Sequence, residues 1–326
     1  MWRMRAPLAL ASGYDRKALV LMQGLVLAHA AETSLPLILQ WNLDPILWLG
    51  IALFVAAYFY ALGPLRRRYG WSATVPRWRV ASFIAGTVIF WLALVSPLDT
   101  LGDEYFFSMH MVQHMLIAVV VPPLWVMGVP GWMLDPILRR PLINRAARFL
   151  THPAVAFGLF NAMIWIWHVP LLYDATLESE AIHITEHLMF VAAGVVLWWP
   201  VLGTAPSLPR ISPMFSVFYL FLSCLPMTAL GALLTFAAQP LYQPYVEAPR
   251  IWGMSALMDQ QLGGLIMWVP TNIPYVLALS IIFIRWMQEA DNTQRARESA
   301  FDEWPEEASG GSTIAATSPT LPGSGT

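Results

Sequence analysis

The chain has 326 residues, of which 57% are hydrophobic and 12% are charged, with a formal net charge of −2 at pH 7. Soluble domains carry about 25% charged residues, so this low content with long apolar runs excludes an ordinary soluble protein and predicts a membrane protein. The slightly negative charge and the lack of a basic patch exclude a nucleic-acid-binding protein, and the single cysteine, Cys224, excludes a disulfide framework and a multi-cysteine metal site.

Residues 1–30 have the order of features typical of a targeting signal. Basic residues precede a short apolar stretch, Ala18 to Ala30, which ends in the sequence Ala28-His29-Ala30. A basic start, a short apolar core and a small-residue end predict a cleavable signal peptide. The alternative is a short N-terminal anchor that stays uncleaved, although the stretch is short for a bilayer span.

Seven apolar segments follow, and each approaches the length of about 20 residues that crosses a bilayer as a helix. They are Pro45–Leu62, Trp78–Val95, Phe106–Trp125, Ala154–Pro170, Ile182–Leu202, Pro213–Phe236 and Ala256–Trp286. The sequence therefore predicts an all-α protein, a polytopic membrane helix bundle of about seven transmembrane helices in one domain over residues 45–286.

The arginines predict how these spans lie in the membrane. Thirteen of them fall after the first, third, fifth and seventh spans, whereas the opposite set of loops holds only Arg250. The thirteen are Arg66, Arg67, Arg68, Arg77, Arg79, Arg139, Arg140, Arg145, Arg148, Arg210, Arg285, Arg295 and Arg297. The positive-inside rule then predicts a mature N-terminus outside the cell and a cytoplasmic tail over residues 287–326. We expect a charged surface helix in Glu289–Glu307 and disorder from about residue 309.

Prolines and glycines mark the last two spans. Pro226, Pro270 and Pro274 predict kinks, and Gly263 and Gly264 predict a close approach of another helix. Aromatic residues around the end of the fourth span predict an interfacial aromatic belt; they are Trp165, Trp167 and Tyr173.

Five of the seven histidines fall in the outer parts of three predicted spans. They are His110, His114, His168, His183 and His187. Residues four apart share one helical face with Cβ atoms about 5–6 Å apart, so His110/His114 and His183/His187 each present two imidazoles together. A single buried histidine is most often a hydrogen-bonded structural residue, but five at one depth in a membrane, where polar groups are costly, indicate function. With His168 between the two pairs, we predict a tetrahedral or trigonal metal site.

Further residues near the histidines predict support for this site. Glu186 lies between His183 and His187, and Asp259 opens the last span, so both are candidates to orient a metal-binding imidazole. Asp103, in the outer loop before the third span, is either a similar partner or a solvated loop residue. Met111 and Met115 form their own stripe, whose thioethers are either soft ligands that favour Cu(I) or ordinary packing residues.

These motifs resemble a known family. The segments that carry the resemblance are His110-Met-Val-Gln-His114-Met-Leu, Trp167-His168-Val-Pro170 with Tyr173, His183-Ile-Thr-Glu-His187, and Asp259-Gln-Gln-Leu-Gly-Gly264 with Met267-Trp268. In this order, over about Pro45 to Trp286, they resemble the polytopic CtaG-type assembly factors of caa(3)-type cytochrome c oxidase, which are distinct from the single-span copper chaperones of the same name. The resemblance implies a bacterial plasma-membrane protein that is needed to make active oxidase, with oxidase subunits as partners and their copper centres as the expected object of its action.

The leading hypothesis is a non-catalytic assembly factor that binds copper at its outer face and passes it to an oxidase subunit. Imidazoles beside thioethers suit copper, and an acidic outer surface attracts cations. One alternative is an intramembrane zinc hydrolase, because His183-x-x-Glu186-His187 matches an inverted zinc-protease pattern in which the glutamate is the general base. Others are a haem protein with histidine axial ligands, although no Cys-x-x-Cys-His motif is present, and a structural oxidase partner without metal.

Overall fold

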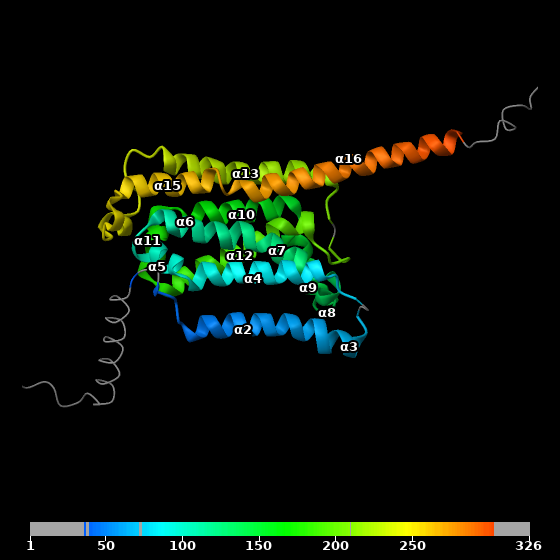
Figure 1. The fold of residues 1–326 in the computed structure, drawn as a ribbon, viewed down its shortest axis with the longest axis horizontal. Coiled ribbons are helices and arrows are strands. Elements are labelled where there is room, and N and C mark those ends of the chain that lie inside the picture. Colours follow the sequence, from blue (N-terminus) through cyan, green and yellow to red (C-terminus); the bar gives the residue numbers. More distant parts are fainter. Residues whose placement is uncertain (1–35, 37–38, 72–73, 209, 303–326) are drawn as a thin grey trace, which may run out of the picture.

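The computed structural model describes residue 36 and residues 39–71, 74–208 and 210–302. The predicted signal segment and the predicted disordered tail lie outside these residues. The described residues form helices and no strands, in a bundle whose long helices run side by side (Figure 1).

The helices follow one another with short connections. They are α2 (Pro45–Tyr60), η2 (Ala61–Leu65), α3 (Arg66–Tyr69), α4 (Arg77–Val95), α5 (Pro97–Glu104), α6 (Phe107–Met115), η3 (Leu116–Val120), α7 (Val121–Gly128), α8 (Gly131–Leu138), α9 (Pro141–Leu150), α10 (Pro153–Trp167), α11 (Pro170–Glu178), α12 (Glu180–Leu202), α13 (Pro213–Thr235), α14 (Gln243–Glu247), η4 (Ile251–Gly253), α15 (Ala256–Trp268) and α16 (Asn272–Asp302).

The prediction of an all-α membrane bundle is confirmed. Among the described residues, six helical stretches are long and apolar enough to cross a membrane, and the number rises to seven if α9 and α10, bent by 69° at their junction, are one span. The fourth predicted span is therefore the least regular: α10 has 15 residues and ends at the cap residue His168. The last span is interrupted between α15 and α16 at Pro270, as the sequence predicts, because proline removes a backbone donor and clashes with the preceding turn.

The third span, formed by α6, η3 and α7, occupies the centre of the bundle. In its most apolar window 67% of the residues are buried, against 6% for the span that begins with α2. It contacts α4, α12 and α15. The predicted close approach at the last span is also present: a Cβ built on Gly264 of α15 would lie 2.7 Å from the carbonyl oxygen of Gly231 on α13. Only glycine fits at such a contact, so these two helices pack backbone to backbone.

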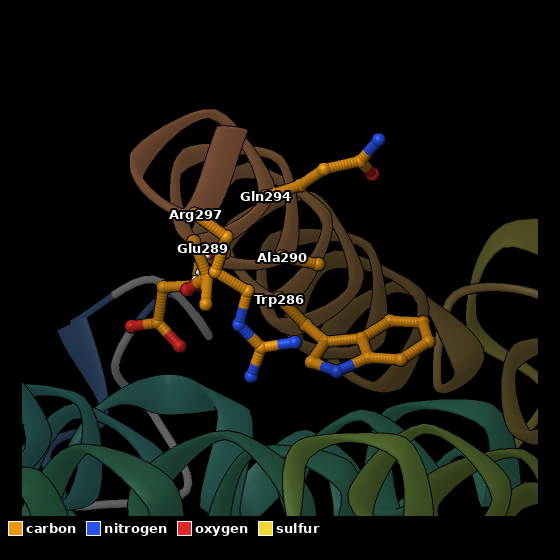
Figure 2. Close-up of a pocket in the computed structure, with 6 residues that line it drawn as sticks. Trp286, Glu289, Ala290, Gln294 and Arg297 are labelled. Carbon is orange, nitrogen blue, oxygen red and sulfur yellow. Dashed lines mark hydrogen bonds between the residues drawn. The ribbon is translucent and has the colours of Figure 1, made fainter. Parts of the chain in front are cut away.

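The bundle has two chemically different ends (Figure 1). At one end lie α5, α11 and the starts of α2 and α15, which we call the histidine end. At the other, the arginine end, lie α3, α8 and α9, and from it α16 extends beyond the bundle. Figure 2 shows the outer part of α16, where Trp286, Glu289 and Arg297 line a shallow hollow along the helix. Arg295 pairs with Asp291 one turn away at 2.8 Å, so this part has the charged surface expected of a helix outside the bilayer.

Candidate metal centre

Two neighbouring helices, α6 and α12, build a cluster of metal-binding side chains at the histidine end. α6 supplies His110 and His114, and α12 supplies His183, Glu186 and His187. One ligand atom from each of these five residues lies within 4.8 Å of the ligand atoms of all the others. Both histidine pairs therefore face each other across the helix interface, which is the arrangement that their spacing predicts.

The cluster is buried and its polar atoms are incompletely paired. His110, His114 and Glu186 are fully buried, and His187 is 8% exposed. His110 Nε2 lies 2.7 Å from His114 Nε2, and His114 Nε2 lies 3.7 Å from a Glu186 carboxylate oxygen. Among the residues that the structure describes, no hydrogen-bond partner contacts His114 Nδ1, Nε2 of His183 or His187, or either oxygen of Glu186. A buried polar group without a partner costs about 1–3 kcal/mol, and a cation among these nitrogens and oxygens would satisfy them together. The residues present thus fit a metal ion.

Asp103, near the end of α5, links the two helices from outside the cluster. One of its carboxylate oxygens lies 3.5 Å from His110 Nδ1 and the other lies 3.5 Å from His183 Nδ1. Burial raises the pKa of this carboxyl well above its usual range, and repulsion from Asp99 and Glu104 adds to the rise. A carboxylate on the Nδ1 side of an imidazole fixes the ring and directs Nε2 toward a metal. Asp103 therefore contacts both histidines from α5, while its side chain stays 32% exposed to solvent.

Two buried tyrosines lie against the cluster at the histidine end of the bundle. Tyr245 of α14 donates a hydrogen bond to the Gly102 carbonyl oxygen at 2.7 Å, and its hydroxyl lies 3.0 Å from His110 Nδ1. The Tyr173 hydroxyl lies 3.3 Å from that of Tyr245. The prediction that Tyr173 belongs to an interfacial belt is wrong, because this side chain is fully buried. Sequence reasoning missed Tyr245 because it follows a loop without a motif.

His168 lies beside the group of five donors and is not one of them. It caps α10, and its Nδ1 lies 2.7 Å from the Ile164 carbonyl oxygen. Its Nε2 lies 3.5 Å from the sulfur of Met111, and Tyr242 donates a hydrogen bond to its backbone oxygen at 3.1 Å. The ring centroids of His168 and His114 are 6.5 Å apart, and Met111 and Met115 both belong to the hydrophobic core.

Asp259 acts on the position of α6 rather than on a histidine ring. From α15 its two carboxylate oxygens accept hydrogen bonds from the backbone N–H groups of Phe107 and Ser108, at 2.7 and 3.0 Å. Backbone N–H groups in the first turn of a helix have no acceptor within that helix. The N-cap residue of α6 supplies no side-chain acceptor either, so Asp259 provides it. Asp259 therefore caps, from a neighbouring helix, the helix that carries His110 and His114.

Replacing Asp259 with alanine should lower the unfolding free energy by about 3 kcal/mol or more, because hydrogen bonds to a charged group contribute about 1.5–3 kcal/mol each and two buried donors lose their partner. Reversible denaturation in detergent measures the change. Asp44→Ala is the matched control, since Asp44 caps the exposed start of α2 and such a cap contributes about 1 kcal/mol. Equal losses in the two variants would contradict the special role of Asp259.

A family model described as "cytochrome c oxidase caa3 assembly factor" matches residues 56–289. The chain belongs to this family. The resemblance of the histidine motifs is thereby confirmed, and the cluster lies within the matched region.

Curated relatives of the chain are known from mycobacteria. Uncharacterized proteins of Mycobacterium bovis and Mycobacterium tuberculosis are each 28% identical over 277 residues, which is 79% of this chain and 41% of the relative. A Mycobacterium leprae protein is 26% identical over 276 residues, with the same coverage. The chain thus spans about 41% of the length of these relatives. No solved structure matches it.

Proposed function

We propose that this assembly factor binds a copper ion between α6 and α12 and supports maturation of an oxidase copper centre. The observation that carries the proposal is the group of four imidazoles and one carboxylate, with ligand atoms within 4.8 Å of one another and several without a hydrogen-bond partner. Imidazole is a common copper ligand. Copper is the cargo here, so the protein acts as a carrier rather than an enzyme.

The surroundings of the cluster favour exchange of an ion. More donors are present than the three or four that copper or zinc needs. An ion therefore has alternative ligands and is released stepwise. The thioether of Met111, against His168 Nε2 at 3.5 Å, supplies a further soft donor next to the cluster. Zinc fits the same nitrogens and oxygens, which makes metal identity the first quantity to measure.

Haem is disfavoured by the packing of the rings. Ring centroids within each pair are 4.1 Å apart, and the rings of His110 and His183, and of His114 and His187, are 5.1 and 5.2 Å apart. Rings in such contact leave no gap for a porphyrin between the two helices. The zinc hydrolase remains the second candidate, because Glu186 lies among the donors with both oxygens unpaired.

Metal analysis of the purified protein, combined with its visible spectrum, tests the proposal. We expect copper to bind near one equivalent per chain, with no Soret band. A protein that holds zinc but excludes copper would favour the hydrolase, and a strong Soret band would favour haem.

Copper delivery to an oxidase subunit also requires an orientation, and we propose that the histidine end faces the outside of a bacterial plasma membrane. The arginine-containing helices α3 and α9 lie at the opposite end, together with α8 and the arginines that follow it, and the positive-inside rule places the cytoplasm there. In this orientation the C-terminus is cytoplasmic. Oxidase subunits in the same bilayer are the partners.

Cysteine labelling tests this orientation. In a Cys224→Ser background, a cysteine replacing the exposed Glu178 of α11 should react with a membrane-impermeant maleimide in intact cells. A cysteine replacing the exposed Arg140, at the arginine end, should react only after lysis. The reverse pattern would put the cluster on the cytoplasmic side and rule out delivery to an outward-facing copper centre.

A further inference from the structure

A cavity of about 660 Å³ lies between α2 and the rest of the bundle. One wall is formed by α2, and the opposite wall includes residues of α4 and α12. The middle of α2 packs loosely over this space: a Cβ built on Gly50, which lines the cavity, would meet no atom within 4 Å.

Helix α2 is hydrogen-bonded to the bundle near its two ends, and between them Trp48 and Phe54 contact aromatic rings of α4 and α7. Near its start, Asn42 donates a hydrogen bond to an Asp99 carboxylate oxygen at 2.9 Å. Near its far end, the Tyr58 hydroxyl donates to the Gly128 carbonyl oxygen at 3.0 Å, and the Tyr58 ring stacks on Phe83. The cavity lies between these two attachments, where the side chains of Leu47 and Phe54 reach the opposite wall and Gly50 leaves space.

The cavity reaches the metal-binding cluster from the side. His183 and His187 line it, whereas His110, His114 and Glu186 do not. The Nε2 atoms of His183 and His187 are buried and have no hydrogen-bond partner. At the outer side, Tyr245 covers His110. The cluster thus borders open space on the side under α2.

Acidic side chains mark the polar part of the cavity, and they are Asp44, Asp99, Asp103 and Glu180. Carboxylates that line a cleft with apolar walls raise the local concentration of cations and their rate of association. Asp103 also contacts both His183, which lines the cavity, and His110, which lies behind it. A carboxylate and two imidazoles therefore connect the cavity with the buried pair on α6.

We propose that the cavity between α2 and α12 is the passage through which the metal ion enters and leaves the cluster. His183 and His187 are the first ligands that an entering ion meets and the last that a leaving ion contacts. This inference rests on the proposed metal binding. It adds a route, and the route affects rates of loading and release rather than the amount of metal bound at equilibrium.

Filling the cavity tests the route. Gly50→Trp places an indole in the open space without a backbone clash, and we expect Cu(I) loading from a coloured chelator to slow at least about tenfold, because association that requires a helix to move aside is slower. Release to a stronger chelator should slow equally, and copper bound at equilibrium should not change. Gly158→Trp on α10 is the matched control, since that exposed glycine also has no atom within 4 Å of an added Cβ and lies outside the cavity lining.

A second variant distinguishes a blocked passage from a folding defect in Gly50→Trp. Ile51→Ala shortens a lining side chain, so it should speed release while Gly158→Trp leaves both rates at the wild-type value. Normal copper binding with unchanged rates in both cavity variants would overturn the passage alone. A wild-type protein that binds no copper would overturn the proposed function and the passage together.

Discussion

The protein with both His114→Ala and His187→Ala should lose copper that the wild-type protein retains. Each histidine comes from a different helix, and each has a buried ring nitrogen without a hydrogen-bond partner. Loss of one ligand or its support commonly reduces metal affinity by about 10–100-fold, so we expect about 10²–10⁴-fold weaker binding in the double variant. Copper content after competition with a chelator of known affinity measures the loss.

His152→Ala is the matched control for this experiment. His152 caps the start of α10, is exposed and lies outside the cluster, so its loss should leave copper binding unchanged. Size-exclusion and circular dichroism profiles like those of the wild-type protein would show that the double variant is folded. If a folded double variant retains copper with wild-type affinity, the ion is held elsewhere and the site between α6 and α12 is wrong.

The histidine cluster could be predicted because it depends on quantities that a sequence contains. The four-residue spacing of His110/His114 and of His183/His187 places the two histidines of each pair on one face of their helix. The alternation of arginine-rich loops predicts the direction of each span, and therefore that both pairs lie at a similar depth in the membrane. Those two facts place both pairs at one end of the bundle. They do not determine which helices touch, so the contact between α6 and α12 required the structure.

The residues around the cluster were harder to predict, for physical reasons. Asp103 and Tyr245 lie in the short helices α5 and α14 between spans, and these helices are too short for a repeating pattern in the sequence to indicate which way a side chain points. Their contacts with His110 depend on how these segments fold back over the bundle. Asp259 was predicted to orient a metal-binding imidazole, but a carboxylate in a membrane protein can pair with a backbone N–H as well as with an imidazole, and here it caps α6.

The position of His168 shows a similar limit. Its place at the outer end of a span predicts the correct depth, but α10 ends there and the imidazole turns back to the Ile164 carbonyl oxygen of its own helix. A residue at a helix end has more conformational choices than one inside a helix, so the spacing of residues in the sequence does not predict where its side chain points. The contacts place the sulfur of Met111 against His168 Nε2, and the ring centroids of His168 and His114 are 6.5 Å apart.

Glu186→Gln should distinguish a copper carrier from a zinc hydrolase. In a carrier the carboxylate helps to attract and hold the ion, and glutamine keeps the shape and one acceptor oxygen, so the loss should be partial. In a hydrolase the carboxylate is the general base, and its removal lowers turnover by at least about 10²–10⁴-fold with metal still bound. The assay is cytochrome c oxidase activity in cells that lack the native protein and carry each variant, at limiting and at excess copper.

We expect Glu186→Gln cells to keep substantial oxidase activity and to regain most of the remainder when copper is added. His114→Ala cells should recover much less, because this variant removes a ligand that added copper cannot replace. Glu178→Gln is the matched control: it changes an exposed glutamate at the same end of the bundle and should behave as wild type. If Glu186→Gln abolishes oxidase activity at every copper level while the purified variant still holds its metal, then Glu186 serves as a base and the carrier hypothesis gives way to hydrolysis.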